Sequence, residues 1–312
     1  MCVLFKHPLT LRTGLLSISV LTNIDIVRNP RYQHGMFDSN SFLTGFAVIL
    51  TLAFTTWCVS LFKRDVSIVD SVWPLLFLAA AATYAATVPQ AGPRTTLVLV
   101  LVGLWGLRLA GYLTWRNWGE PEDRRYQKIR RRNEPHFALK SLYLIFGLQG
   151  TLAWIISLPL LAAIAAPRDL TVLDYAGVAL WAVGLGFETV GDWQLARFKS
   201  VAANRGRVMD QGLWRYTRHP NYFGDCCTWW GFYLIGLAAG GWWALVGPLL
   251  MSILLLRVSG VALLERDISE RRPAYRDYML RTNAFFPGAP KRLARGIGEA
   301  PDADPDSDEG QV

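Results

Sequence analysis

The chain alternates long apolar runs with short polar connections that are mostly basic. Each run extends over about 20 residues, the length that an α-helix needs to cross the hydrocarbon core of a bilayer. The pattern predicts an all-α fold, namely a polytopic membrane protein with about seven transmembrane helices in one bundle. The predicted spans are 42–62, 67–88, 95–115, 139–165, 170–196, 221–239 and 241–264.

The predicted bundle occupies residues 42–290, and the segments on either side of it differ from it in composition. Residues 1–41 contain a short apolar stretch that no small-residue cleavage site follows, so we interpret them as an N-terminal extension rather than a signal peptide. Residues 291–312 are rich in Asp and Glu and poor in apolar side chains, which is typical of a disordered acidic tail.

Composition and charge agree with a membrane location. Of the 312 residues, 52% are hydrophobic, which is too many for an ordinary soluble domain of this length. The net charge is +8, and the basic residues are concentrated in alternate connections, whereas the other connections contain little beyond Arg94 and Arg168. We therefore attribute the charge to the positive-inside rule and not to nucleic-acid binding. The prediction is an integral, multi-pass protein with cytoplasmic basic loops and C-terminus; without a clear targeting signal, a bacterial plasma membrane is favoured.

Polar residues are densest at the start of the sixth run, where 212–225 reads GLWRYTRHPNYFGD. Pro220 fits the first turn of a helix, where its missing N–H has no helical partner to lose. Asn221 and Asp225 are four residues apart and so share one face of that helix. With Arg218 just before it, the helix start is a candidate site for phosphate or another anion. The alternative is that the arginines only anchor the chain at the membrane surface.

A second polar group ends the fifth run. Glu188, Asp192 and Lys199 follow one another at intervals of four and seven residues, which places them on one helix face. At a membrane interface, and close in sequence to 212–225, they suit the hydroxyl and amide groups of a sugar–base cofactor. The alternative is a ladder of surface ion pairs.

The early runs contain charged residues that a membrane span does not need. Asp70 falls in the first turn of the second run, and an ionisable residue there is a functional candidate; its alternative is a simple interaction with the helix dipole. In the third run, Trp105, Arg108 and Tyr112 share one face with Trp115. We interpret this face as the lining of a substrate cavity, although the aromatic residues also suit packing.

The loop at 116–136 mixes acidic, basic and aromatic residues, whereas plain lipid anchoring needs only the basic ones. This mixture predicts a folded cap over the cytoplasmic mouth of the bundle. Arg124, Arg125 and Tyr126 are candidates to contact a dinucleotide from this cap.

These motifs support a resemblance to a known group of proteins. The stretch at 212–225 resembles the signature of the membrane reductases of the steroid 5-alpha-reductase superfamily. The sequence SIVDSVW at 67–73 and the sequence RRPAYRDY at 271–278 resemble its bacterial branch of unknown substrate, the DUF1295 family. The resemblance covers roughly 42–290, most of the chain.

The resemblance implies an NADPH-dependent oxidoreductase that reduces an activated C=C bond of a lipid or steroid-like enone. It implies that the substrate carbonyl is held by residues at the positions of Asp70 and of Trp105 or Tyr112. The residues that it implies for holding the nicotinamide cofactor are Glu188, Asp192, Lys199, Asn221, Asp225 and Arg257. Glu188 stands where the family has Asn, and Asp225 where it has Glu.

Two common kinds of cofactor site are not found in the sequence. No Gly-x-Gly-x-x-Gly follows a predicted strand, so a dinucleotide would have to sit in the bundle itself. The four cysteines form no Cys-x-x-Cys motif and have no His at ligand spacing, so we expect neither a structural disulfide nor a metal site.

Two other functions remain open. Isoprenylcysteine carboxyl methyltransferases contain a similar Arg-His-Pro-x-Tyr-x-Gly motif, and an S-adenosylmethionine-dependent membrane methyltransferase would place His219, Tyr222 and Glu265 around its cofactor. A non-catalytic lipid- or sterol-binding protein would need only the apolar cavity near Trp105 and Trp115. All three functions imply a lipid-like small molecule and membrane lipids as partners.

Overall fold

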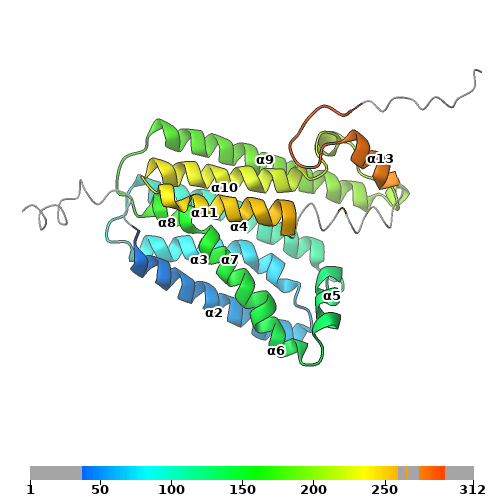
Figure 1. Cartoon of the computed structure of the whole chain (residues 1–312), viewed down its shortest axis with the longest axis horizontal. Coiled ribbons are helices and arrows are strands. Elements are labelled where there is room, and N and C mark those ends of the chain that lie inside the picture. Colours follow the sequence, from blue (N-terminus) through cyan, green and yellow to red (C-terminus); the bar gives the residue numbers. More distant parts are fainter. Residues whose placement is uncertain (1–36, 259–264, 266–273, 292–312) are drawn as a thin grey trace, which may run out of the picture. The chain divides into compact units, whose positions relative to one another are not determined.

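The computed structural model describes residues 37–258, 265 and 274–291 (Figure 1). The described residues form helices and loops and contain no strand, as the predicted all-α fold requires. They divide into two compact units, which we describe separately. Unit 1 comprises Met1–Trp181 and Trp229–Leu250, and unit 2 comprises Ala182–Thr228 and Met251–Val312. Of the predicted N-terminal extension and the predicted acidic tail, only residues 37–41 and 291 are among the described residues.

Unit 1 is built on three long helices that lie side by side, α2 (Ser39–Lys63), α3 (Ile68–Thr87) and α4 (Pro93–Asn117) (Figure 1). Asp38 caps α2 by accepting a hydrogen bond from the Ser41 amide at 2.9 Å. Small residues let the helices approach closely, because a Cβ on Gly106 would lie 3.1 Å from the Pro74 carbonyl oxygen. The remaining elements that lie wholly in unit 1 are α5 (Arg124–Asn133), α6 (Phe137–Ser141), η1 (Leu142–Gly147), α7 (Leu148–Ile156), α8 (Leu158–Ile164) and η4 (Trp242–Leu245).

Four helices of the described chain are long and apolar enough to cross a membrane. They are Ser39–Lys63, Ile68–Thr87, Pro93–Asn117 and the continuous run Phe137–Ile156. The described part of the seventh predicted run forms a shorter apolar helix, Trp242–Arg257. The four helices agree with the predicted membrane protein, and the count of seven spans stays a prediction.

The predicted single helix over 139–165 is wrong, because the structure interrupts it at Ser157, between α7 and α8. Pro159 has no N–H to donate to the preceding turn and favours the start of a new helix. The Ser157 hydroxyl donates to the Trp154 carbonyl and shares a hydrogen bond with the Tyr84 hydroxyl, both at 2.7 Å. The interruption is therefore held in place by polar groups inside unit 1.

An ion pair is buried in unit 1 between Arg94 of α4 and Asp174. Nε and Nη2 of Arg94 donate to the two carboxylate oxygens of Asp174, each at 2.7 Å. The same guanidinium donates to the backbone carbonyls of Arg168 and Asp169. Arg94, one of two basic residues on the sparsely charged side of the predicted topology, is thus a structural residue.

Unit 2 contains the ends of two long helices, α9 (Val172–Ser200) and α10 (Pro220–Ala238), each of which also has a part in unit 1. Within unit 2 these helices meet backbone to backbone. A Cβ on Gly184 would lie 2.5 Å from the Gly224 carbonyl oxygen, and a Cβ on Gly224 would lie 2.5 Å from the Glu188 amide nitrogen. Only glycine fits at such a contact, and the contact leaves Glu188 buried beside α10.

The other elements of unit 2 are short. They are η2 (Ala202–Asn204), η3 (Gly212–Arg215), the π-helical η5 (Leu254–Val258) and α13 (Ala274–Arg281); α11 (Val246–Ile253) spans the boundary between the units. The prediction that a helix begins at Pro220 is confirmed, since Pro220 is the first residue of α10. Tyr275 and Tyr278 belong to α13. Both tyrosines are buried.

Candidate functional site

The candidate site lies in unit 2, where the chain turns through η3 into α10. Gly212 has a φ of 59°, in the left-handed region that glycine adopts without strain. Directly after it, the Leu213 amide donates to the Gln194 side chain at 2.9 Å, and the Trp214 indole donates to the Gly191 carbonyl at 3.0 Å. Both bonds hold the loop against α9, so the residues that start α10 have a fixed position relative to α9.

Arg218 joins this loop to the C-terminal part of unit 2. Its Nε and Nη2 donate to the two carboxylate oxygens of Glu265 at 2.7 and 2.9 Å, and its Nη1 donates to the carbonyls of Met279 and Thr282 at 2.9 and 2.5 Å. Four of the five N–H donors of the guanidinium are therefore in use. Arg218 was predicted to contact the cofactor, and this geometry makes it a positioning residue.

His219 shares the same carboxylate. Its Nε2 lies 3.1 Å from Oε1 of Glu265, and its ring stacks on that of Tyr222 with centroids 5.5 Å apart. Burial alone would raise the pKa of Glu265, but the hydrogen bonds from His219 and Arg218 lower that pKa below its ordinary value. Burial, with the Glu265 carboxylate nearby, raises the pKa of Tyr275 to about 12. Glu265 is thus ionised at neutral pH, and Tyr275 keeps its proton.

Three acidic residues are buried where α9 and α10 meet in unit 2, namely Glu188, Asp192 and Asp225. The Asn221 side-chain amide donates to Oδ1 of Asp192 at 3.3 Å, and its own oxygen accepts from the Tyr222 amide at 3.1 Å. Carboxylates are expensive to bury and mark a functional site more often than a structural one in apolar helices. The resemblance assigns four of these residues to the cofactor, namely Glu188, Asp192, Asn221 and Asp225. In the structure they belong to the parts of α9 and α10 that lie in unit 2.

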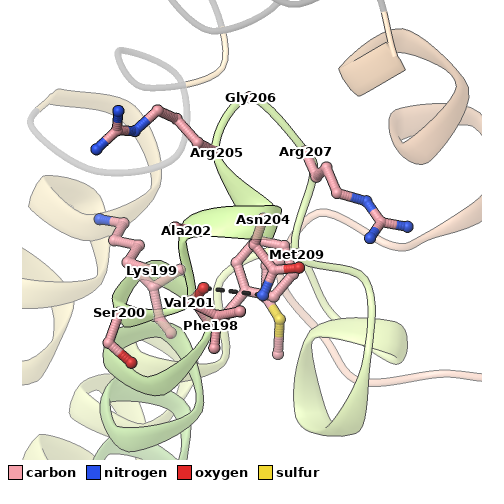
Figure 2. Close-up of a pocket in the computed structure, with 11 residues that line it drawn as sticks. Phe198, Lys199, Ser200, Val201, Ala202, Asn204, Arg205, Gly206, Arg207 and Met209 are labelled. Atoms are coloured by element: carbon pink, nitrogen blue, oxygen red, sulfur yellow. Dashed lines mark hydrogen bonds between the residues drawn. The ribbon is translucent and has the colours of Figure 1, made fainter.

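A pocket of about 330 Å³ opens at the C-terminal end of α9 (Figure 2). Its wall contains Lys199 and, beyond η2, Arg205 and Arg207. Figure 2 shows Lys199 and Arg205 extending to the same side of the loop, and the Asn204 amide donating to the Phe198 carbonyl. The predicted Lys199 thus has two basic neighbours in the pocket. In the sequence, Arg205 and Arg207 are two of the basic residues that follow the fifth apolar run, and nothing in their spacing distinguishes them from the others.

Asp70 belongs to a separate cluster in unit 1. Its carboxylate accepts from Arg125 Nη2 at 2.7 Å and from the Tyr126 hydroxyl at 2.6 Å, and Gln149 donates to the same hydroxyl at 3.1 Å. Burial and the Asp70 charge raise the pKa of Tyr126, so its phenol stays protonated. Arg125 and Tyr126, which were predicted to face a dinucleotide, therefore anchor α5 to the start of α3.

The other predicted residues have varied surroundings. Trp105 is fully buried in an aromatic cluster with Phe77 and Trp229, at centroid distances of 5.7 and 5.5 Å, which is the packing of a core residue. Arg108 and Tyr112 are half-buried farther along α4. Arg257 is exposed in the π-helical η5. The predicted substrate residues thus fall in unit 1, and the residues that the resemblance implies for holding the cofactor fall in unit 2.

Comparisons with other proteins identify a relative and a family, and both are described as uncharacterized or of unknown function. An uncharacterized protein of Schizosaccharomyces pombe is 26% identical over 287 residues, which cover 80% of this chain and 81% of that protein. No solved structure matches the chain. The family described as a protein of unknown function, DUF1295, matches residues 56–282. This match spans most of both units, and the chain therefore belongs to the DUF1295 family.

Proposed function

We propose that the chain is a membrane-embedded, NADPH-dependent reductase that acts on an activated C=C bond of a lipid or steroid-like enone. The proposal includes membership of the steroid 5-alpha-reductase superfamily and seven membrane spans, with α9, α10 and the helix that begins at Trp242 added to the four apolar helices. It also includes cytoplasmic basic loops and C-terminus, and a bacterial plasma membrane.

The observation that carries the proposal is the change of polarity along α9. Glu188 and Asp192 are buried acceptors, and Lys199 stands at a basic pocket seven residues after Asp192, about 10.5 Å farther at a rise of 1.5 Å per residue. A nicotinamide dinucleotide has the matching polarity, since its hydroxyl and carboxamide groups need acceptors and its phosphates need cations.

The residues of unit 2 fit this cofactor in three ways. Asp192 and Asn221, already in hydrogen-bond contact, would bind the ribose hydroxyls and the carboxamide, with Asp225 one turn farther along α10. Lys199, Arg205 and Arg207 would hold the phosphates, since guanidinium groups bind phosphate in a bidentate way. Arg218 and Glu265 would keep the start of α10 in position for both. When bound, the cofactor supplies the hydride.

The substrate would be handled by residues of unit 1. Reduction of an enone places negative charge on the carbonyl oxygen, so the protein must direct a donor or a positive charge at that atom. Arg108 and Tyr112 are half-buried on one face of α4 and are our candidates for this role. Asp70, bonded to Arg125 and Tyr126, would hold α5 at the start of α3.

The first test is a binding titration of NADPH and S-adenosylmethionine to the detergent-purified full-length protein. We expect saturable binding of NADPH only. The Asn221→Ala variant should bind NADPH at least tenfold more weakly, because it loses an amide that contacts Asp192. The matched control is Asn133→Ala, at the end of α5 in unit 1, which should bind as the wild type does. Equal affinity of the Asn221→Ala protein would refute the cofactor site.

One observation supports the alternative that the protein is an S-adenosylmethionine-dependent methyltransferase. The parallel rings of His219 and Tyr222, with Glu265 beside them, form an aromatic and anionic group that suits the sulfonium of S-adenosylmethionine. Binding of S-adenosylmethionine without NADPH would therefore favour that function. Binding of neither by folded protein would favour the non-catalytic lipid binder.

A further inference from the structure

Helix α5 presents two faces of different chemistry. Its inner face contains Arg125, which pairs with Asp70 and Asp123, and Arg130, whose Nε and Nη2 donate to Glu122 at 3.0 and 2.7 Å. The guanidinium of Arg130 also lies 4.5 Å from the centroid of the Phe137 ring. The inner arginines are thus engaged by carboxylates and an aromatic ring within unit 1.

The outer face of α5 is basic and exposed. It consists of Arg124, Lys128, Arg131 and Arg132, all exposed to solvent. At 100° per residue, these positions fall within about one quadrant of the helix circumference. The charges on this face are therefore directed together and outward.

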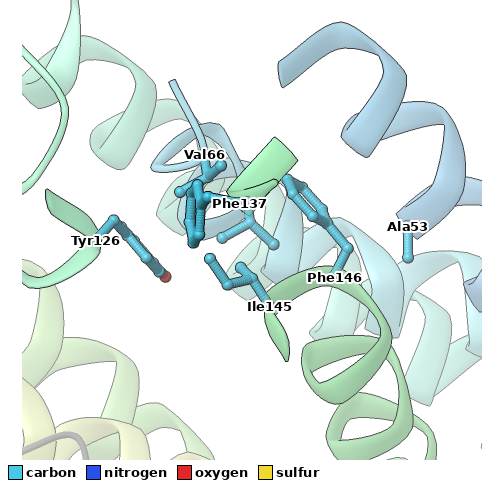
Figure 3. Close-up of a cluster of buried hydrophobic side chains, with 7 residues drawn as sticks. Ala53, Val66, Tyr126, Phe137, Ile145 and Phe146 are labelled. Atoms are coloured by element: carbon cyan, nitrogen blue, oxygen red, sulfur yellow. The ribbon is translucent and has the colours of Figure 1, made fainter. Parts of the chain in front are cut away.

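The outer face is held in a fixed orientation by the packing beneath it. Tyr126 belongs to a buried cluster that includes Val66, Phe137 and Ile145 (Figure 3). Ile129 packs against this cluster. Together with the ion pairs of Arg125 and Arg130, this packing prevents α5 from rolling about its axis. The basic face is thus a rigid part of unit 1 rather than a mobile run of charge.

The surroundings of α5 have the character of a membrane interface. Large apolar side chains are exposed at the adjoining ends of apolar helices, namely Phe62 at 90% in α2, Trp115 at 66% in α4, and Trp118 at 79% just after α4. Tryptophan is enriched where a span enters the headgroup layer. Because α5 connects α4 with the apolar run Phe137–Ile156, it must lie at the surface from which both helices enter the membrane.

We propose that the outer face of α5 is a binding surface for the headgroups of anionic phospholipids. Arg124, Arg131 and Arg132 would contact lipid phosphates, while Trp115, Trp118 and Phe62 would lie among the upper acyl chains. The charge of the face, its fixed orientation and its position between two spans all favour a lipid of the surrounding bilayer as the occupant. Lipid binding at this surface would not require the proposed cofactor to be bound.

Native mass spectrometry of the full-length protein with phosphatidylglycerol or phosphatidylcholine tests the proposal. We expect the wild type to retain phosphatidylglycerol preferentially. The R124Q/R131Q/R132Q variant should bind phosphatidylglycerol on the order of 100-fold more weakly, from about 1 kcal/mol for each charge removed near the surface. The matched control is R168Q/R215Q/R276Q, which removes the same charge at three exposed arginines of other segments and should retain the preference.

Each other outcome has a defined meaning. No preference of the wild type for phosphatidylglycerol, or an equal loss in the control variant, overturns the proposal. The proposal is also overturned if phosphatidylglycerol is retained only by a variant truncated after Lys291. In that case the acidic segment 292–312 would occupy the surface in the full-length chain. If the R124Q/R131Q/R132Q protein does not fold, the wild type is titrated with salt. Lipid retention that is independent of salt then counts against the proposal.

Discussion

Two arginines show how this protein keeps charge in its interior. Arg218 donates to both oxygens of Glu265 and to two backbone carbonyls, and Arg94 does the same with Asp174 and another pair of carbonyls. Such complete pairing is required, because an unpaired buried charge costs several kcal/mol. At this scale a residue such as Arg218 affects function through the neighbours that it positions.

Glu265 provides a prediction that depends on pH. Its pKa is lowered in the folded protein, so its charge adds stability above the ordinary glutamic acid pKa, near 4.3, and this stability is lost as the pH falls through the folded pKa. At pH 7 the Glu265→Gln variant should be less stable by about 2 kcal/mol, because Arg218 keeps only neutral partners. Thermal unfolding in detergent at a series of pH values measures this difference.

The difference between wild type and Glu265→Gln should become smaller from about pH 5 downward. A difference that stays constant to pH 3.5 would contradict the ion pair with Arg218. The Glu120→Gln variant, at an exposed position, is the control and should be as stable as the wild type at pH 7.

At the scale of elements, the contact between α9 and α10 decides where the candidate site forms. In unit 2 the contact is made at Gly184 and Gly224, and nearby a Cβ on Gly191 would lie 3.1 Å from the Pro220 ring. The helices can approach so closely only because these positions have no side chain. The close approach brings Asn221 of one helix within hydrogen-bond distance of Asp192 of the other.

The glycines of α9 allow a matched pair of substitutions. Gly184→Ala should destabilise the protein by about 1–3 kcal/mol, because its methyl group would meet backbone atoms of α10 that cannot move aside. Gly186→Ala, two residues along, meets no atom within 4 Å and should be stabilising by about 0.5–1 kcal/mol through helix propensity. The two melting temperatures, together with NADPH affinity, measure both effects. Equal behaviour of the two variants would show that the helices do not touch at Gly184.

At the scale of the whole molecule, the distribution of charge along the chain predicts its orientation in the membrane. The connections after α2, α4 and α9 are basic, whereas the connection between α8 and α9 is not, apart from Arg168. Arg94, the other exception to this distribution, is buried in an ion pair and carries no topological information. The orientation stays a prediction that depends on the basic connections after α2, α4 and α9.

Labelling of single cysteines tests this orientation. In a variant without native cysteines, Lys128→Cys and Arg168→Cys should react with a membrane-impermeant maleimide from opposite sides of the membrane, because the apolar run Phe137–Ile156 lies between them. Inside-out vesicles should label position 128, and right-side-out vesicles position 168. Labelling of both positions from one side would contradict the assignment of that run as a span.

The helical class, the approximate positions of most apolar helices and the start of α10 at Pro220 could be predicted from the sequence. These features depend on local properties, namely the length of apolar runs and the fixed backbone of proline, which can be read from neighbouring residues. The resemblance to DUF1295 is likewise carried by short motifs, and the family match confirms it. The candidate residues of the 212–225 motif were found for the same reason.

Which of these residues contact one another becomes visible only in the folded chain. Arg218 and Glu265 are 47 positions apart, and Asp70 and Tyr126 are 56 apart, so no local pattern reveals either pair. The interruption at Ser157 was not predicted, because Ser157 shares a hydrogen bond with Tyr84 of another helix and a hydropathy pattern contains no information about hydrogen bonds. The pocket beside Lys199 depends on how the chain folds back after α9. Such contacts result from the packing of helices that are distant in sequence, which apolar periodicity alone leaves undetermined.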